Sequence, residues 1–162
     1  MTYLNLINGV LRRLREDEVA NVTANTYSKM VGDFVNDAKD LVETSWDWSA
    51  LRSTLTITTS ADDNLYSLTG FRSEGKVLNL INDTSNLQME YQTQTWFDDK
   101  EYIQGAVTGA PQYYTYSGVD VNGDCQIKIY PTPEKAYTLR AMVVLRNVEL
   151  SANTDALAIP SA

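Results

Sequence analysis

Apolar residues recur at three- and four-residue intervals in two segments near the amino terminus, which is the spacing of one face of an α-helix. Residues 2–16 and 26–45 are therefore predicted to be helices, with Thr2 and Asn25 as their N-caps. The apolar stripe of the second helix is formed by Tyr27, Met30, Val31, Phe34, Ala38, Leu41 and Val42. A polar linker joins the segments, so we expect an antiparallel helical hairpin in which the two apolar stripes face each other.

After residue 46 the pattern changes from helical spacing to alternation. Leu55 and Ile57 alternate with threonines, which is typical of a half-buried strand at 54–58. Further strands are predicted at residues 64–68, 76–82, 87–93, 112–117, 125–130 and 137–147. Residues 82–86 and the Asn122-Gly123 dipeptide predict hairpin turns. One short exposed helix is predicted at residues 94–103, because glycines and a proline follow it.

Two helices followed by about seven short strands predict an α+β fold. We expect an N-terminal helical hairpin or bundle at residues 1–48, then an antiparallel β-sandwich or barrel-like domain at 49–150, and a C-terminal extension at 151–162. Trp46 and Trp48 lie at the junction of the first two parts. We interpret them as core anchors that tie these parts together.

Composition narrows the possible functions. The 162 residues carry a formal net charge of −8 and no histidine. The acidity disfavours binding to nucleic-acid phosphates, and the missing imidazoles remove histidine-dependent nucleophiles and metal ligands. The acidic residues at 62–63, 98–99 and 120–124 lack the arrangement of a glycosidase pair or a calcium loop, and we interpret them as turn residues. No catalytic residue, metal site or cofactor is predicted, and no apolar run reaches the ~20 residues of a membrane span.

The first group of candidate contact residues is a basic cluster. Arg12, Arg13 and Arg15 lie on or beside the polar side of the first helix, near its C-terminal end. They are placed to contact an acidic partner surface. A solvated helix end explains them equally well, because cations suit the negative end of the helix dipole.

The second group of candidate contact residues consists of tyrosines. Tyr113, Tyr114 and Tyr116 lie in one predicted strand. Alternation places Tyr114 and Tyr116 on one face and Tyr113 on the other, so one face is expected to join the core. The other face would present amphipathic rings, which suit a protein interface or a sugar.

Four segments resemble, in their order along the chain, the head-to-tail adaptor (connector) proteins of tailed bacteriophages, of the tail tubular protein A type. They are YLNLINGVLRRLRE at 3–16, WDW at 46–48, GAPQYY at 109–114 and IKIYPTP at 127–133. The resemblance implies a structural protein of the virion neck or tail, assembled in the host cytoplasm, with no enzymatic activity, cofactor or membrane. Its partners would be further copies of itself in a ring, typically a dodecamer, the portal protein above, and a downstream tail or nozzle protein. Double-stranded DNA would pass through the ring without specific binding, repelled by the acidic side chains.

Members of that family usually continue beyond the position matched by residues 157–160 with a further helix and a portal-engaging tail. We expect either a shortened member or part of a longer chain. The helical part would then be completed by that further helix or by neighbouring subunits. The alternative function is a carbohydrate-binding or tail-fibre-associated β-module in which Tyr113, Tyr114 and Tyr116 form a stacking platform.

Overall fold

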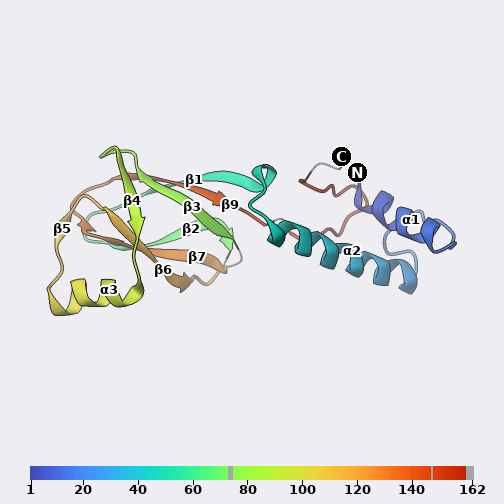
Figure 1. The fold of residues 1–162 in the computed structure, drawn as a ribbon, viewed down its shortest axis with the longest axis horizontal. Coiled ribbons are helices and arrows are strands. Elements are labelled where there is room, and N and C mark those ends of the chain that lie inside the picture. Colours follow the sequence, from blue (N-terminus) through green and yellow to red (C-terminus); the bar gives the residue numbers. More distant parts are fainter. Residues whose placement is uncertain (73–74, 147, 160–162) are drawn as a thin grey trace. The chain divides into compact units, whose positions relative to one another are not determined.

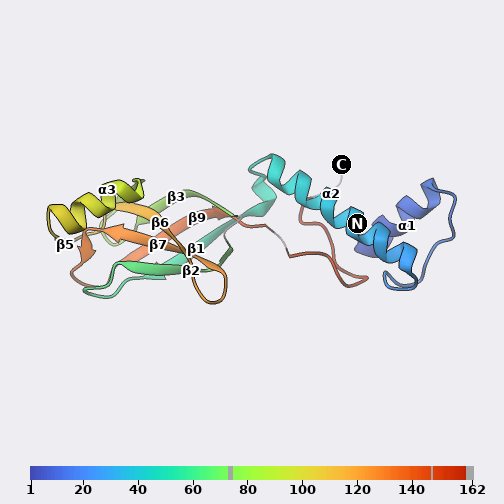
Figure 2. The ribbon, with the colours of Figure 1, turned by 90° about the horizontal axis from the view of Figure 1, so that it is seen from below.

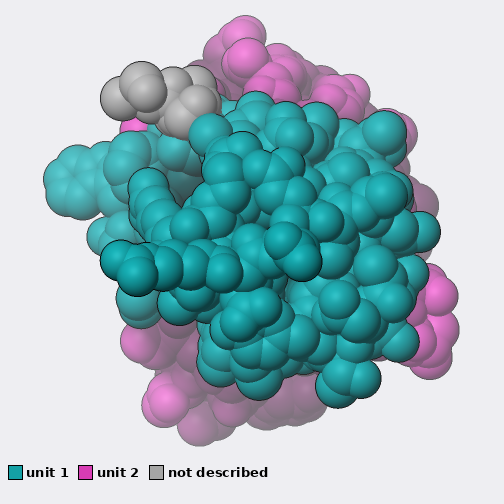
Figure 3. Space-filling model, turned by 90° about the vertical axis from the view of Figure 1, so that its right-hand side faces the viewer, with its two compact units in different colours: residues 1–51, 146–162 teal, residues 52–145 magenta. Residues whose placement is uncertain are grey.

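The computed structural model describes residues 1–72, 75–146 and 148–159 (Figure 1; turned by 90° in Figure 2). The chain forms two compact units, coloured separately in Figure 3. Unit 1 comprises residues 1–51 and 146–162 and carries the long helices, whereas unit 2 comprises residues 52–145 and carries the strands. The described part of the C-terminal segment therefore lies in the same compact unit as the helices.

Unit 1 contains α1 (Tyr3–Arg13), α2 (Thr26–Ser45) and the short 3-10 turn η1 (Ser49–Leu51). Both predicted N-caps are confirmed. Thr2 Oγ1 accepts a hydrogen bond from the Asn5 N–H at 3.4 Å. Asn25 Oδ1 accepts from the Ser28 N–H at 2.7 Å, and the Ser28 hydroxyl accepts from the Asn25 N–H in return. This capping box fixes the start of α2.

The two helices meet through small side chains on α2. Helix α1 buries Tyr3, Ile7 and Leu11, as its periodicity predicts. Helix α2 turns Ser28 and Gly32 inward, and a Cβ added at Gly32 would overlap the Tyr3 hydroxyl. Only a glycine permits this approach of the two helices. Of the predicted apolar stripe of α2, Val31 is buried against α1 as expected, but Tyr27, Met30, Phe34, Leu41 and Val42 are exposed, so the expectation that both apolar stripes face each other is only partly confirmed.

The C-terminal segment completes unit 1. The Asn36 side chain exchanges two hydrogen bonds with the backbone of Leu150, at 3.1 and 3.0 Å. The Tyr3 N–H donates to the Asp155 carbonyl at 2.7 Å, and the Val22 N–H donates to Asn153 Oδ1 at 3.0 Å. Leu150 is buried in the same core as the α1 residues. These contacts explain why the segment belongs to unit 1.

Unit 2 is a seven-stranded sheet in the order β1-β9-β3-β4-β6-β7-β2. Its strands are β1 (Arg52–Thr58), β2 (Leu65–Arg72), β3 (Lys76–Asn82), β4 (Leu87–Tyr91), β6 (Tyr113–Val119), β7 (Asp124–Tyr130) and β9 (Thr138–Val144). All neighbours pair antiparallel except β4 and β6, which are parallel. The two end strands approach each other, so the sheet is nearly closed and barrel-like. The α+β class and both predicted hairpins, β3–β4 and β6–β7, are confirmed.

Between β4 and β6 lie the helix α3 (Gln94–Asp98) and the π-helical turn η2 (Asp99–Ile103). The short helical segment predicted at 94–103 is therefore present, but it is exposed only on one side: Tyr102 and Ile103 are 76% and 80% exposed, whereas Phe97 is fully buried and Trp96 packs on Tyr113 and Tyr130. Glu101 of η2 forms an ion pair with Lys128 of β7. A short parallel pair, β5 (Thr108–Gly109) with β8 (Thr132–Pro133), was not predicted.

The acidic residues singled out in the sequence are turn and cap residues. Asp120 accepts hydrogen bonds from the N–H groups of Asn122 and Asp124 at 2.8 and 3.0 Å. Desolvation raises the pKa of Asp120, but these backbone bonds outweigh it and the pKa is lowered. Asp63 accepts from the Leu65 N–H, at 3.2 Å. Asp98 and Asp99 accept from the side chains of Gln94 and Gln104, respectively.

Candidate functional site

A row of exposed apolar side chains runs along α2. It consists of Tyr27, Met30, Phe34, Leu41 and Val42, which are 39–72% exposed, and we call it the α2 stripe. Folded monomers rarely leave a contiguous apolar surface of this kind open to water. The α2 stripe is therefore the candidate interaction surface.

The spacing of the α2 stripe indicates what kind of element covers it. Tyr27, Phe34 and Leu41 are seven residues apart, and seven residues make about two helical turns. They form one line along the helix, while Gly32 and Lys39 lie on its buried side. A seven-residue apolar repeat is typical of a helix that packs against another helix.

An acidic row borders the α2 stripe on one side. Asp33, Asp37 and Asp40 follow each other at four- and three-residue spacing, and all three are exposed. Lys39 Nζ lies 3.1 Å from a carboxylate oxygen of Asp40. Within the described residues, Asp33 and Asp37 form no ion pair. This row was not predicted, although its i, i+4, i+7 spacing places the three side chains on one side of a helix.

The basic cluster lies at the C-terminal end of α1, as predicted. Arg12 and Arg13 occupy the last turn, and Arg15 follows with a φ of 62°. Arg12 Nη1 lies 2.9 Å from a Glu18 carboxylate oxygen. Arg13 and Arg15 are exposed and, within the described chain, form no ion pair. Their role as contact residues stays a prediction.

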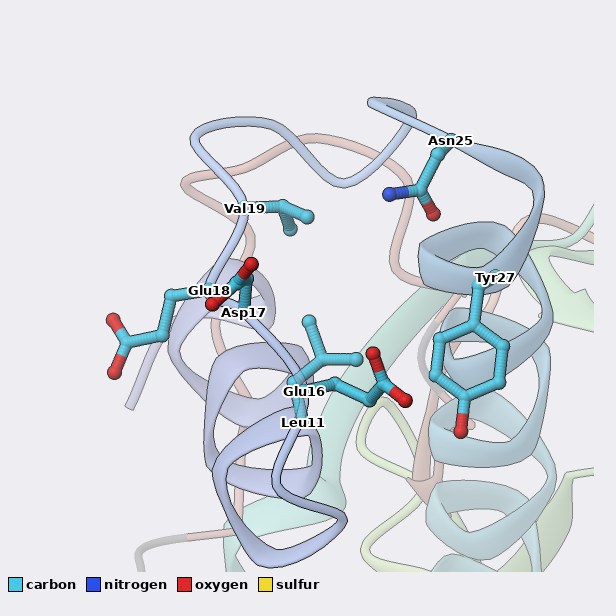
Figure 4. Close-up of a pocket in the computed structure, with 7 residues that line it drawn as sticks. All are labelled: Leu11, Glu16, Asp17, Glu18, Val19, Asn25 and Tyr27. Atoms are coloured by element: carbon cyan, nitrogen blue, oxygen red, sulfur yellow. The ribbon is translucent and has the colours of Figure 1, made fainter.

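A cleft of about 350 Å³ lies between the end of α1, the following loop and the start of α2 (Figure 4). It is lined by Leu11, Glu16, Asp17, Glu18, Val19, Asn25 and Tyr27. Figure 4 shows the Glu16 carboxylate between Leu11 and Tyr27, whereas Glu18 points away. Among the residues that the structure describes, no group of three or more His, Cys, Asp or Glu side chains is placed to hold a metal ion.

The three candidate tyrosines do not share one surface. Tyr114 and Tyr116 lie on one face with ring centroids 6.3 Å apart, and Tyr91 lies 5.7 Å from each of them. Tyr113 lies on the other face, where Trp96 covers it at 4.9 Å. The prediction that Tyr113 lies on the opposite face from Tyr114 and Tyr116 is confirmed. The prediction that all three rings form one stacking platform is wrong.

The pKa of Tyr116 reflects the partial burial of this aromatic cluster in unit 2. Burial, followed by the neighbouring Tyr114, raises the pKa of Tyr116 to about 12, although a backbone hydrogen bond with Val77 opposes the shift. The residue as a whole is 39% exposed, so Tyr116 is a partly buried side chain of unit 2.

The two tryptophans of the junction differ. Trp46 is the C-cap residue of α2 and is 70% exposed, and its role as an anchor between the two parts stays a prediction. Trp48 is half-buried, and its indole Nε1–H donates to the Val42 carbonyl at 2.8 Å.

Comparison with known proteins adds an independent finding. None of the helices in the described residues is long and apolar enough to cross a membrane. A search of curated proteins finds no match. The family described as SU10 adaptor protein matches residues 1–162, which is the whole chain. The chain therefore belongs to the SU10 adaptor protein family, a family of structural adaptor proteins of bacteriophages.

Proposed function

We propose that this protein is a head-to-tail adaptor of the tail tubular protein A type, which forms a ring below the portal of a tailed bacteriophage. The ring, a dodecamer in this proposal, extends the DNA channel and carries the downstream tail or nozzle protein. Membership of a phage adaptor family supports a structural role in the virion neck and contacts with portal and tail proteins.

The observation that carries the proposal is the exposed α2 stripe. Unit 1 already has its own core, built from α1, the other side of α2 and the C-terminal segment. The α2 stripe is not needed for that core and remains available to another chain. Its composition of tyrosine, methionine, phenylalanine and leucine is that of a protein interface, where aromatic residues and methionine are enriched.

The acidity of the chain supports the proposed channel. Each copy carries a net charge of −8, so a ring of copies presents a strongly negative assembly. Such a surface repels DNA phosphates. In the proposed ring, double-stranded DNA moves past without specific binding.

The carbohydrate-binding alternative is not retained. It needed Tyr113, Tyr114 and Tyr116 on one surface, and Trp96 covers Tyr113 on the opposite face. No other observation on unit 2 favours a sugar.

Electron microscopy of the protein mixed with its phage's portal protein tests the proposal. Each protein incubated alone is the control, and mass spectrometry checks that the chain is intact. We expect a new ring layer on the portal. A folded, intact protein that adds no layer contradicts the proposal.

The same experiment with two variants tests the role of the α2 stripe. Phe34→Ser should abolish the layer, because Phe34 is 60% exposed at the centre of the stripe. Tyr102→Ser is the matched control, since Tyr102 is 76% exposed but lies in unit 2. An unchanged layer with Phe34→Ser contradicts the assignment of the interface.

A further inference from the structure

We infer that the end of α1 from a second copy of this chain covers the α2 stripe, so that copies join head to tail. The inference rests on the proposed function, because it concerns the contact between neighbours in the proposed ring. It names the occupant of the α2 stripe and the polarity of the assembly.

The two surfaces complement each other in charge. At the end of α1, the exposed Leu14 stands between Arg13 and Arg15, which form no ion pair within the described residues. On α2, Phe34 stands beside Asp33 and one turn from Asp37. Neither of these aspartates has an ion-pair partner in the part of the chain that the structure describes. Each surface therefore consists of an apolar side chain bordered by two unpaired charges, and the signs are opposite.

The third arginine near the end of α1 is already engaged. Arg12 is paired with Glu18 at 2.9 Å. Glu16 and Asp17 line the cleft, and Figure 4 shows the Glu16 carboxylate between Leu11 and Tyr27. Arg13 and Arg15 are thus the cations that remain for a partner.

The contact cannot form within one chain. Leu11 near the end of α1 and Tyr27 at the start of α2 line the same cleft. Asp37 lies ten residues beyond Tyr27, which is about 15 Å along the helix. Tyr3, at the far end of α1, occupies the position opposite Gly32. Arg13 and Arg15 are therefore held near the start of α2 and reach the Asp37 region only in another copy.

Repulsion between the acidic rows also disfavours a twofold-symmetric pairing of two antiparallel α2 helices. An isologous interface brings the same patch of both subunits together. The acidic row of one helix would then lie along the acidic row of the other, and like charges at helix contacts are destabilising. A head-to-tail contact uses two different patches, and its repetition closes a ring when the rotation per copy fits.

Cross-linking between two singly labelled proteins tests this arrangement. The lone Cys125 is first replaced by serine. One batch then carries Leu14→Cys and the other Phe34→Cys, and the batches are mixed with the portal and treated with a short bismaleimide. We expect cross-links between position 14 of one copy and position 34 of another. A predominance of 34–34 cross-links, or the absence of 14–34 cross-links, overturns the inference.

Charge reversal provides a second test that does not alter the apolar residues. Arg13→Glu with Arg15→Glu, or Asp33→Lys with Asp37→Lys, should each weaken assembly about tenfold at low salt. All four changes in one chain should restore assembly, because the signs are again opposite. Failure of the quadruple variant to assemble better than either double variant contradicts the inference.

Matched controls separate specific contacts from net charge. Lys100→Glu with Lys135→Glu changes the net charge as the arginine pair does, and Asp62→Lys with Asp63→Lys changes it as the aspartate pair does, but all four residues lie in unit 2. We expect both control variants to assemble normally. If the wild-type protein forms a layer and the charge-reversed variants do so equally well, only the inference fails. If the wild-type protein forms no layer, the proposed function fails.

Discussion

The two units use their apolar side chains in opposite ways. In unit 2, Ile129 and Leu139 are completely buried inside the barrel. In unit 1, Phe34 and Leu41 of α2 face outward, whereas Lys39 and Glu43 of the same helix are buried, with their charged groups 3.5 Å apart. The barrel of unit 2 therefore buries these side chains within one chain, whereas unit 1 has a smaller core of its own and leaves the α2 stripe exposed. Under the proposed function, the buried residues stabilise the fold and the α2 stripe stabilises the assembly.

The largest effect on stability is expected from a truncation in the barrel of unit 2. Leu139→Ala removes a side chain with no exposed surface, so the lost burial and the remaining cavity should lower the free energy of unfolding by about 2–5 kcal/mol. Urea unfolding followed by circular dichroism measures this loss. A loss below about 1 kcal/mol would mean that the barrel is less well packed than the structure shows.

A smaller effect is expected where the helices of unit 1 meet. Gly32→Ala places a Cβ against the Tyr3 hydroxyl and 3.3 Å from the ring carbon Cζ. Overpacking of about 1–3 kcal/mol exceeds the gain of about 1 kcal/mol in helix propensity, so we expect a net loss of about 1 kcal/mol. Thermal unfolding measures it.

Two further variants sharpen the Gly32 result. In a Tyr3→Phe background the overlapping hydroxyl is gone, so Gly32→Ala should cost less there. Gly9→Ala in α1 is the control, because no atom lies within 4 Å of its added Cβ, and it should stabilise the protein by about 1 kcal/mol. Equal stabilisation by Gly32→Ala and Gly9→Ala would show that α1 and α2 are not in close contact.

Periodicity predicted the elements well but not which surfaces they bury. The limits of α2 and the strand at 76–82 agree with the structure to the residue. On the buried side of α2, Val31 was predicted, but Ser28, Gly32 and Asn36 were missed because they pack through small size and hydrogen bonds, which a hydrophobic pattern does not weigh. Their spacing of four residues was the available signal of a close helix contact. The candidate arginines were found, but their acidic counterpart on α2 was not.

A pH-dependent effect is expected at the C-terminal segment of unit 1. The N–H groups of Ser151 and Ala152 each donate to the Asp155 carboxylate at 2.7 Å, which lowers the pKa of Asp155 below its ordinary 3.8. A lowered folded-state pKa stabilises the fold above the ordinary value and loses this contribution as the pH falls through the lowered one. Amide hydrogen exchange of Ser151 and Ala152 should therefore accelerate, relative to its intrinsic rate, below pH 3.8.

Substitution of the carboxyl group isolates this effect. Asp155→Asn should remove the pH dependence of protection in this segment, because an amide does not titrate in that range. Asp37→Asn, on the exposed side of α2, should leave it unchanged. A pH dependence that survives Asp155→Asn would assign the effect to another group.

The smallest effect on stability, and the sharpest test of the comparison, is expected from Leu41→Ala. It is the same substitution as Leu139→Ala, but Leu41 is 72% exposed in the single chain. The free energy of unfolding of the monomer should change by no more than about 0.5 kcal/mol. Assembly on the portal should nevertheless weaken, because an apolar residue of an interface contributes when the partner covers it. Urea unfolding and layer formation on the portal measure the two effects on one protein sample. A monomer destabilised as strongly as by Leu139→Ala would mean that this side of α2 is covered within its own chain, and the distinction between the two units would fail.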